Sequence, residues 1–209
     1  MKVIPFIYND IDDLMANTYL LSDGINCVVI DPSKDYEGIS NYISKNNLKL
    51  KGILLTHGHY DHMRGVKNLL KYANVPLFIG FYDVDNLKDS QKNLSNLFSD
   101  ENIIIDKEPI SVYDKQEIEL LKEPIIVLET PFHTRGSVCY YLKDSKILFS
   151  GDTLFKYSIG RDDLYGACPK ERKTSLAKLM SLPDDVKIYP GHGEFSSIGE
   201  ERKYNPFVK

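Results

Sequence analysis

The chain has 209 residues, a formal net charge of −4 from 26 Lys and Arg against 30 Asp and Glu, and 42% hydrophobic residues. This length and apolar content suffice for one domain with a substantial core, which we expect to span residues 1–209. The mild acidity and the scattered lysines argue against a nucleic-acid partner, because such partners are normally bound by a basic face.

Short apolar runs separated by turn residues dominate the first part of the chain. Apolar residues at helical spacing predict two helices, at residues 35–46 and 66–72. A Ser-Asp-Gly turn at residues 22–24 separates two of the apolar runs. The strands predicted in this part are residues 3–8, 18–21, 27–30, 53–55 and 77–79.

The second part opens with residues 83–100, which are polar, rich in Asn and Lys and only weakly helical in pattern, so their role stays open. A clear helix is predicted at residues 170–181, with Leu176, Leu179 and Met180 on one side. The remaining predicted strands are residues 103–105, 117–120, 125–129, 138–142, 147–149 and 186–189. This order of elements predicts an α/β (α+β) fold of two mixed sheets flanked by helices.

The cysteines and the lengths of the apolar runs indicate the cellular compartment in which we expect the protein. Cys27 and Cys139 lie in strand-like runs and are expected in the core, whereas Cys168 lies in a loop. An odd number of cysteines without paired spacing favours a reducing compartment. No apolar run approaches the length of a membrane span, so we expect a cytoplasmic protein that does not bind membranes.

All five histidines belong to one pattern. The first three lie in the motif at residues 56–62, and each histidine group, like Asp152, directly follows a predicted strand. Loops at one end of a sheet can converge on a point, which is where sites in open sheets usually form. The candidate metal ligands are His57, His59, Asp61, His62, His133, Asp152 and His192.

Five imidazoles and two carboxylates can form the protein shell of two adjacent divalent cations. Neutral imidazole and carboxylate suit zinc, iron or manganese, and zinc is the first expectation. The competing interpretation is a set of unrelated surface or core histidines, and we reject it because it would require every histidine to fall into the pattern by accident. A degenerate, non-catalytic metal site is disfavoured because every ligand position is filled.

These motifs resemble a known family. Residues 56–62, 130–134, 150–152 and 190–193 together resemble the metallo-β-lactamase fold superfamily, and residues 149–155, 159–164 and 198–207 are most similar to its glyoxalase II (hydroxyacylglutathione hydrolase)-like branch. The similarity spans nearly the whole chain and implies a four-layer αββα sandwich. It also implies a ligand assignment: His57, His59 and His133 on one metal, Asp61, His62 and His192 on the other, and Asp152 bridging both.

Two departures from the family pattern stand out. Phe132 replaces the Gly that usually precedes the histidine, so we expect the backbone or the pocket wall to differ there. The chain also ends soon after His192, whereas longer glyoxalase II enzymes add a helical domain that helps to hold glutathione. This second departure leaves the identity of the thiol carrier open, and it affects the expected reaction less.

The expected reaction is thioester hydrolysis by a hydroxide held between the metals, with Asp61 and Asp152 orienting it. All histidines are used as ligands, so none can serve as a general acid. A thiolate, whose thiol has a pKa of about 8.5, leaves without such help, unlike an alkoxide or an amine anion. This favours a small thioester over a phosphodiester or a β-lactam, with glutathione as one candidate carrier, although water or another carboxyl group could also supply a proton.

Lys156, Arg161 and Tyr165 follow the Asp152 loop and could bind an acidic carrier. Alternatively they are ordinary surface residues, or Arg161 forms a structural pair with Asp162 or Asp163. Two other activities of related enzymes stay in view. One is a persulfide dioxygenase with a single iron, which here would bind His57, His133 and Asp152, and the other is RNA processing, which the acidic balance disfavours. The acyl group, the native metal and the oligomeric state stay open.

Overall fold

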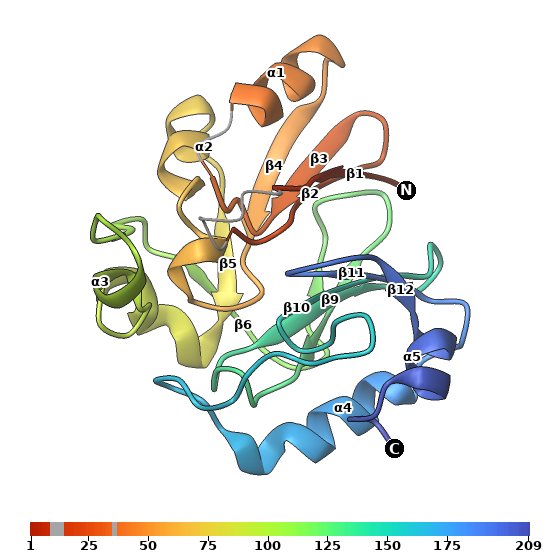
Figure 1. Ribbon diagram of the computed structural model, residues 1–209. Coiled ribbons are helices and arrows are strands. Elements are labelled where there is room, and N and C mark those ends of the chain that lie inside the picture. The colour runs from red at the N-terminus through yellow and green to blue at the C-terminus, as the bar shows by residue number, and fades with distance from the viewer. Residues whose placement is uncertain (9–14, 35–36) are drawn as a thin grey trace.

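Two six-stranded sheets pack face to face in the computed structural model, with helices covering the outer face of each (Figure 1). The structure describes residues 1–8, 15–34 and 37–209. The predicted αββα sandwich of two mixed sheets is confirmed. Among the described residues, no helix combines the length and the apolar character needed to cross a membrane.

The first sheet follows chain order from β1 to β6. Its first three strands pair antiparallel, and the next three add in parallel. Parallel neighbours need a crossover, which helix α1 (Glu37–Lys45) supplies between β3 and β4 and helix α2 (Val66–Tyr72) between β4 and β5. The strands are β1 (Lys2–Phe6), β2 (Thr18–Ser22), β3 (Asn26–Ile30), β4 (Lys49–Leu54), β5 (Leu77–Gly80) and β6 (Ile110–Val112).

The second sheet has the order β12-β11-β10-β9-β8-β7. Helix α4 (Arg172–Met180) is the crossover between the parallel strands β10 and β11, and α5 (Ile198–Tyr204) follows β12. The strands are β7 (Glu117–Ile118), β8 (Ile125–Glu129), β9 (Val138–Leu142), β10 (Ile147–Gly151), β11 (Lys187–Pro190) and β12 (Ser196–Ser197).

Alternation along the strands divides the core into three layers. In β3, Val29 belongs to the cluster under α1 and α2, whereas Val28 and Ile30 belong to the cluster between the sheets. The inter-sheet layer also holds Tyr19 and Phe149, whose ring centroids lie 5.3 Å apart. A third cluster joins the second sheet to α4 and α5. Strands buried on both faces explain the continuous apolar runs of the sequence.

The strand predicted at residues 103–105 is wrong. Ile103 and Ile105 pack against the core under α1 and α2, but their backbone amides bond to Ser95 Oγ and to the carbonyl of Leu87 rather than to a strand. Strand β6 forms further on instead. The strand expected at residues 117–120 is shortened to Glu117–Ile118.

Several helix boundaries also differ from the sequence pattern. The helix expected at residues 35–46 is described from Glu37, because residues 35–36 lie outside the described part of the chain. Helix α4 begins after a 3-10 turn at Pro169–Glu171, where the fixed backbone of proline suits a first turn. The polar stretch forms the 3-10 segment Phe81–Lys88 and α3 (Ser95–Phe98), and α5 was not predicted.

Candidate metal centre

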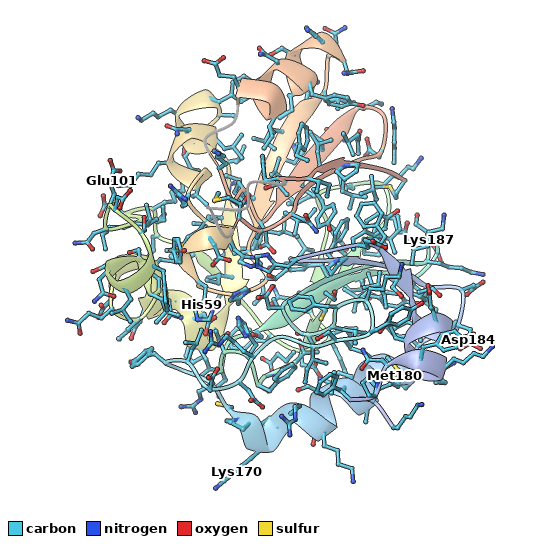
Figure 2. All side chains as sticks on the ribbon, in the orientation of Figure 1. His59, Glu101, Lys170, Met180, Asp184 and Lys187 are labelled. Atoms are coloured by element: carbon cyan, nitrogen blue, oxygen red, sulfur yellow. The ribbon has the colours of Figure 1, made fainter. Side chains whose placement is uncertain are left out.

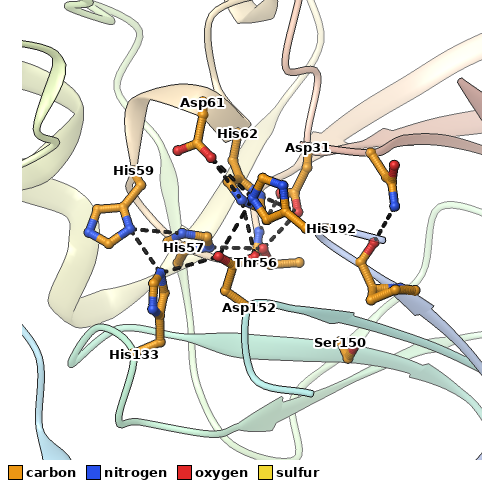
Figure 3. A network of polar contacts seen from close by, with 12 residues as sticks. Asp31, Thr56, His57, His59, Asp61, His62, His133, Ser150, Asp152 and His192 are labelled. Carbon is orange, nitrogen blue, oxygen red and sulfur yellow. Dashed lines mark hydrogen bonds and ion pairs between the residues drawn. The ribbon is translucent and has the colours of Figure 1, made fainter. Parts of the chain in front are cut away.

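The seven candidate ligands come together at one end of the two sheets, where β4, β8, β10 and β11 end (Figure 3). His59 is buried, whereas Glu101 and Lys187, which lie toward the outline of the molecule in Figure 2, are exposed. Three sets of side chains offer ligand atoms within 4.8 Å of one another: His57, His59 and His133; His57, His62 and Asp152; and Asp61, His62 and His192.

The first set consists of imidazoles alone. Nδ1 of His59 lies 3.1 Å from Nε2 of His57 and 2.9 Å from Nε2 of His133. All three residues are buried. Ligand nitrogens about 2.0–2.1 Å from a tetrahedral zinc would be separated by similar distances, so the spacing fits one cation.

The other two sets each contain one carboxylate, Asp152 or Asp61. Oδ2 of Asp61 lies 3.6 Å from Nε2 of His62 and 3.2 Å from Nε2 of His192. Asp152 lies between the set of His57, His59 and His133 and the set of Asp61, His62 and His192, with Oδ1 3.3 Å from Nε2 of His62 and Oδ2 3.5 Å from Nε2 of His133. The carboxylate of Asp152 therefore faces histidines of both sets.

Hydrogen bonds behind the rings fix which nitrogen faces the centre. Nδ1 of His133 lies 2.6 Å from the carbonyl of Arg161, and Nδ1 of His62 lies 2.9 Å from Oδ2 of Asp31. Because these oxygens only accept, each Nδ1 must carry the proton. Nδ1 of His57 faces Thr56 Oγ1, whose own proton goes to Asp31 (3.2 Å and 2.7 Å). In all three rings, Nε2 is therefore the nitrogen that faces the centre.

Some of the atoms that face the centre lack a hydrogen-bond partner. Nε2 of His62 and Oδ1 of Asp152 are buried and have no hydrogen-bond partner among the described residues. Buried polar atoms without partners are costly, and a cation held between them would satisfy both. The donor set of imidazole and carboxylate suits a divalent transition metal, so the residues fit two such ions.

The pKa shifts differ between the set of His57, His59 and His133 and the side chains around Asp61 and Asp152. Burial lowers the pKa of His57, and lowers that of His59 to about 3, which keeps both rings neutral. Burial also opposes charge on His62, but Asp61 and Asp152 raise its pKa well above the usual value. Burial alone would raise the pKa of Asp152, yet His192 and His62 hold it well below its usual range. The two carboxylates that can attract a cation therefore face His62 and His192 rather than His57 and His59.

Two buried carboxylates that the sequence patterns did not identify hold the ligand loops. Asp31 accepts from the amide of Thr56 (2.8 Å) and from His62. Asp83 accepts from the amides of Gly58 and Gly136, at 2.8 Å each, and so joins the first histidine loop to the loop after His133. Both aspartates directly or closely follow strands of the first sheet, β3 and β5, and this position is the signal that could have identified them.

Glycine is required where the loops crowd the centre. A Cβ on Gly191 would lie 2.2 Å from Oδ1 of Asp152 and 2.7 Å from Cε1 of His62. A Cβ on Gly58 would lie 2.6 Å from Cβ of Asn86. Any side chain at these positions would displace a candidate ligand or its loop.

A cavity of about 300 Å³ opens onto the candidate ligands. Its walls are largely apolar and come from three parts of the chain: the first histidine motif, the α3 region and the loop after Asp152. The residues that line it, besides His59, Asp61, His133, Asp152 and His192, are Tyr60, Leu94, Phe98, Phe155, Gly160, Arg161 and Leu164. The polar stretch left open by the sequence therefore supplies one wall.

The three candidate substrate residues have different surroundings. Arg161 lines the cavity but is paired with Asp163, through Nε to Oδ1 at 2.7 Å and Nη2 to Oδ2 at 2.9 Å. Lys156 pairs with Glu194 at 2.6 Å, outside the cavity lining. Tyr165 is exposed and is also not among the lining residues.

The unusual Phe132 lies away from the cavity. Its side chain is fully buried in the layer beneath α4. The aromatic ring therefore fills the core rather than narrowing the space above the ligands. Cys27 and Cys139 are buried as expected, and Cys168 is partly exposed.

Comparison with known proteins gives consistent matches. Residues 11–192 match the family model of the metallo-beta-lactamase superfamily. A probable metallo-hydrolase, YqgX of Bacillus subtilis, is 31% identical over 93% of both chains. The hydroxyacylglutathione hydrolase GloC of Haemophilus influenzae is 34% identical over 89% of both chains.

Solved structures with the same fold include two of similar length. The B3 metallo-beta-lactamase BLEG-1 superposes with a TM-score of 0.87 at 32% identity, covering 92% of this chain and 94% of the other. TTHA1623, solved in a di-iron-bound form, superposes with a TM-score of 0.83 at 30% identity, covering 98% and 99%.

Proposed function

Since this chain belongs to the metallo-beta-lactamase superfamily, we propose that it is a binuclear metal-dependent hydrolase that acts on small thioesters. The observation that carries the proposal is the pair of adjacent ligand sets with Asp152 between them. The first set would consist of His57, His59 and His133, and the second of Asp61, His62 and His192. Zinc is the preferred metal, and iron is the main alternative because TTHA1623 was solved with two irons.

Bound divalent metals would supply hydroxide at neutral pH, by lowering the pKa of water, and would polarise the scissile carbonyl. The residues of the chain have separate tasks. Asp152 and Asp61, both nearly buried among the histidines, orient the attacking group. The apolar cavity walls exclude bulk water and leave room for a small acyl group. Asp31 and Asp83 keep the ligand loops in position.

The leaving group decides between substrate classes. No histidine remains for use as a general acid, because all five are in the candidate ligand sets. The hydroxyl of Tyr60, which lines the cavity, donates to the carbonyl of Phe98 at 3.1 Å. A leaving group that needs no protonation therefore suits this site, and a thiolate meets that requirement better than an alkoxide or an amine. The similarity to a hydroxyacylglutathione hydrolase supports the same choice.

The test combines metal analysis with a substrate panel. Protein purified without chelator is assayed for metals and then for hydrolysis of S-D-lactoylglutathione, a β-lactam and a phosphodiester. We expect about two transition-metal ions per chain and a clear preference for the thioester. Preferential cleavage of the β-lactam or the phosphodiester would contradict the proposal. A single iron per chain with oxygen uptake on a persulfide would support the dioxygenase alternative instead.

A further inference from the structure

We propose that Asp163 sets the carrier selectivity of the cavity by occupying Arg161, so that thioesters of uncharged carriers are favoured over those of acidic ones. The inference rests on the proposed thioesterase function and defines its substrate class further. It assigns a role to a residue that neither binds the candidate metals nor lines the cavity.

Arg161 is held beside the candidate metal centre by its backbone. Its carbonyl accepts a hydrogen bond from Nδ1 of His133 at 2.6 Å. Just before it, Gly160 donates its amide to the carbonyl of Asp152 at 3.1 Å, and a Cβ on Gly160 would lie 2.0 Å from that oxygen. The side chain of Arg161 therefore starts from a fixed point at the edge of the cavity.

Arg161 is also the only Lys or Arg among the described residues that line this cavity. An acidic carrier that reached the cavity would find its one cationic partner there. Asp163, however, already accepts from two guanidinium N–H groups in a side-on, bidentate arrangement. This arrangement neutralises the charge and places a carboxylate where the carboxylate of a carrier would approach.

The pair can be displaced, because both partners are solvent-exposed. The side chain of Arg161 is 59% exposed and that of Asp163 is 66% exposed. Exposed pairs are weak, so competition with a carrier should change binding by a few-fold rather than by orders of magnitude. A carrier without negative charge makes no use of the guanidinium and does not meet this competition. The cavity walls that it contacts are apolar.

The neighbouring residue offers a matched control. Asp162 also pairs with an arginine, since Oδ2 of Asp162 accepts from Nη1 of Arg172 at 2.8 Å. Arg172 does not line the cavity. Replacing Asp162 by Asn removes the same charge from the same loop without releasing Arg161. It therefore separates a general electrostatic effect from release of the guanidinium.

The experiment compares KM for two lactoyl thioesters, one of glutathione and one of N-acetylcysteamine, which is uncharged. In Asp163→Asn, KM for the glutathione thioester should fall by about threefold relative to KM for the uncharged one. Asp162→Asn should leave the ratio of the two KM values unchanged. In the double variant Arg161→Ala/Asp163→Asn, the gain should disappear. Circular dichroism and metal content confirm that each variant is folded and loaded.

Other outcomes overturn the inference in distinguishable ways. If Asp163→Asn raises KM for the glutathione thioester, Asp163 positions Arg161 for the carrier rather than competing with it. If both substrates or both Asn variants respond equally, the effect is not specific to the Arg161 pair. In either case the thioesterase proposal still stands. If metal-loaded wild-type protein hydrolyses neither thioester, the thioesterase proposal fails and the selectivity inference fails with it.

Discussion

Nδ1 of His62 lies 2.9 Å from Oδ2 of Asp31, and both side chains are almost completely buried. The same Asp31 oxygen accepts from the hydroxyl of Thr56 at 2.7 Å, and Thr56 in turn faces His57. One carboxylate at the end of β3 thus orients a histidine of each candidate metal set. Groups of this kind hold a metal ligand in one tautomer and raise its basicity.

Replacing Asp31 by Asn should therefore weaken metal binding while the fold survives. The amide group keeps the size of the side chain but removes the charge that orients the rings of His62 and His57. We expect zinc affinity to fall by about 10- to 100-fold in competition with a chromogenic chelator. Asp185→Asn, at an exposed carboxylate, is the control. Equal affinities for the wild type and Asp31→Asn would show that Asp31 does not support the ligands.

Replacing Asp83 by Ala should lower the free energy of unfolding. Its buried carboxylate accepts from the amides of Gly58 and Gly136 and from the hydroxyl of Thr134 (2.7 Å). Asp83→Ala leaves these buried donors without an acceptor, at a cost of about 2–4 kcal/mol in the free energy of unfolding. Denaturant unfolding of metal-free protein measures this cost without a contribution from bound metal. A change below about 0.5 kcal/mol, the range of ordinary surface substitutions, would contradict the role.

Asp152→Ala should remove turnover. Its carboxylate lies between the two candidate metal sets, so its loss affects both the spacing of the metals and the orientation of the attacking group. We expect the thioesterase kcat to drop by orders of magnitude, with a far-ultraviolet circular dichroism spectrum like that of the wild type. Hydrolysis at the wild-type rate by the variant would refute the proposed mechanism.

Metal loss on acidification should occur in two steps. Burial opposes protonation of all four rings, but Asp61 and Asp152 raise the pKa of His62, and Asp152 and Asp61 raise that of His192. Burial leaves His57 and His59 with lowered pKa values. As pH falls, protons therefore compete for His62 and His192 first, and the set with Asp61 should lose its metal at the higher pH. Metal content after dialysis across pH 7 to 4 measures this, and simultaneous loss of both metals would contradict it.

Arg161→Ala should weaken the binding of an acidic carrier more than the binding of a neutral one. The guanidinium lines the cavity and can bind an acidic carrier that displaces Asp163. Loss of such a contact, made equally in ground state and transition state, raises KM without changing kcat. Steady-state kinetics with the glutathione and N-acetylcysteamine thioesters checks this. Lys156→Ala is a suitable comparison, because Lys156 pairs with Glu194 away from the cavity lining. An equal response of both substrates would make Arg161 a structural residue.

The sequence by itself determined the ligand types and their places at strand ends. Strict local signals carried this information: apolar runs of strand length and histidine motifs that follow them directly, as at residues 56–62. Helix α2 was predicted at its observed bounds, because its apolar spacing is set within a few residues. Local sequence patterns did not predict the secondary structure correctly where contacts between distant residues determine it. Ile103 and Ile105 are apolar enough for a strand, yet they pack beneath the 3-10 segment and pair with no strand.

Only the tertiary structure decided which distant groups meet. Asp83 touches residues 25 and 53 positions away, and no pattern in one sequence encodes a hydrogen bond over such separations. The cavity wall formed by Leu94 and Phe98 depends on how the α3 region folds over the first histidine motif. The partner of Arg161 was likewise undecided between two adjacent carboxylates. In the folded loop, Arg161 pairs with Asp163, whereas Asp162 pairs with Arg172, because neighbouring residues in a loop point to different surroundings.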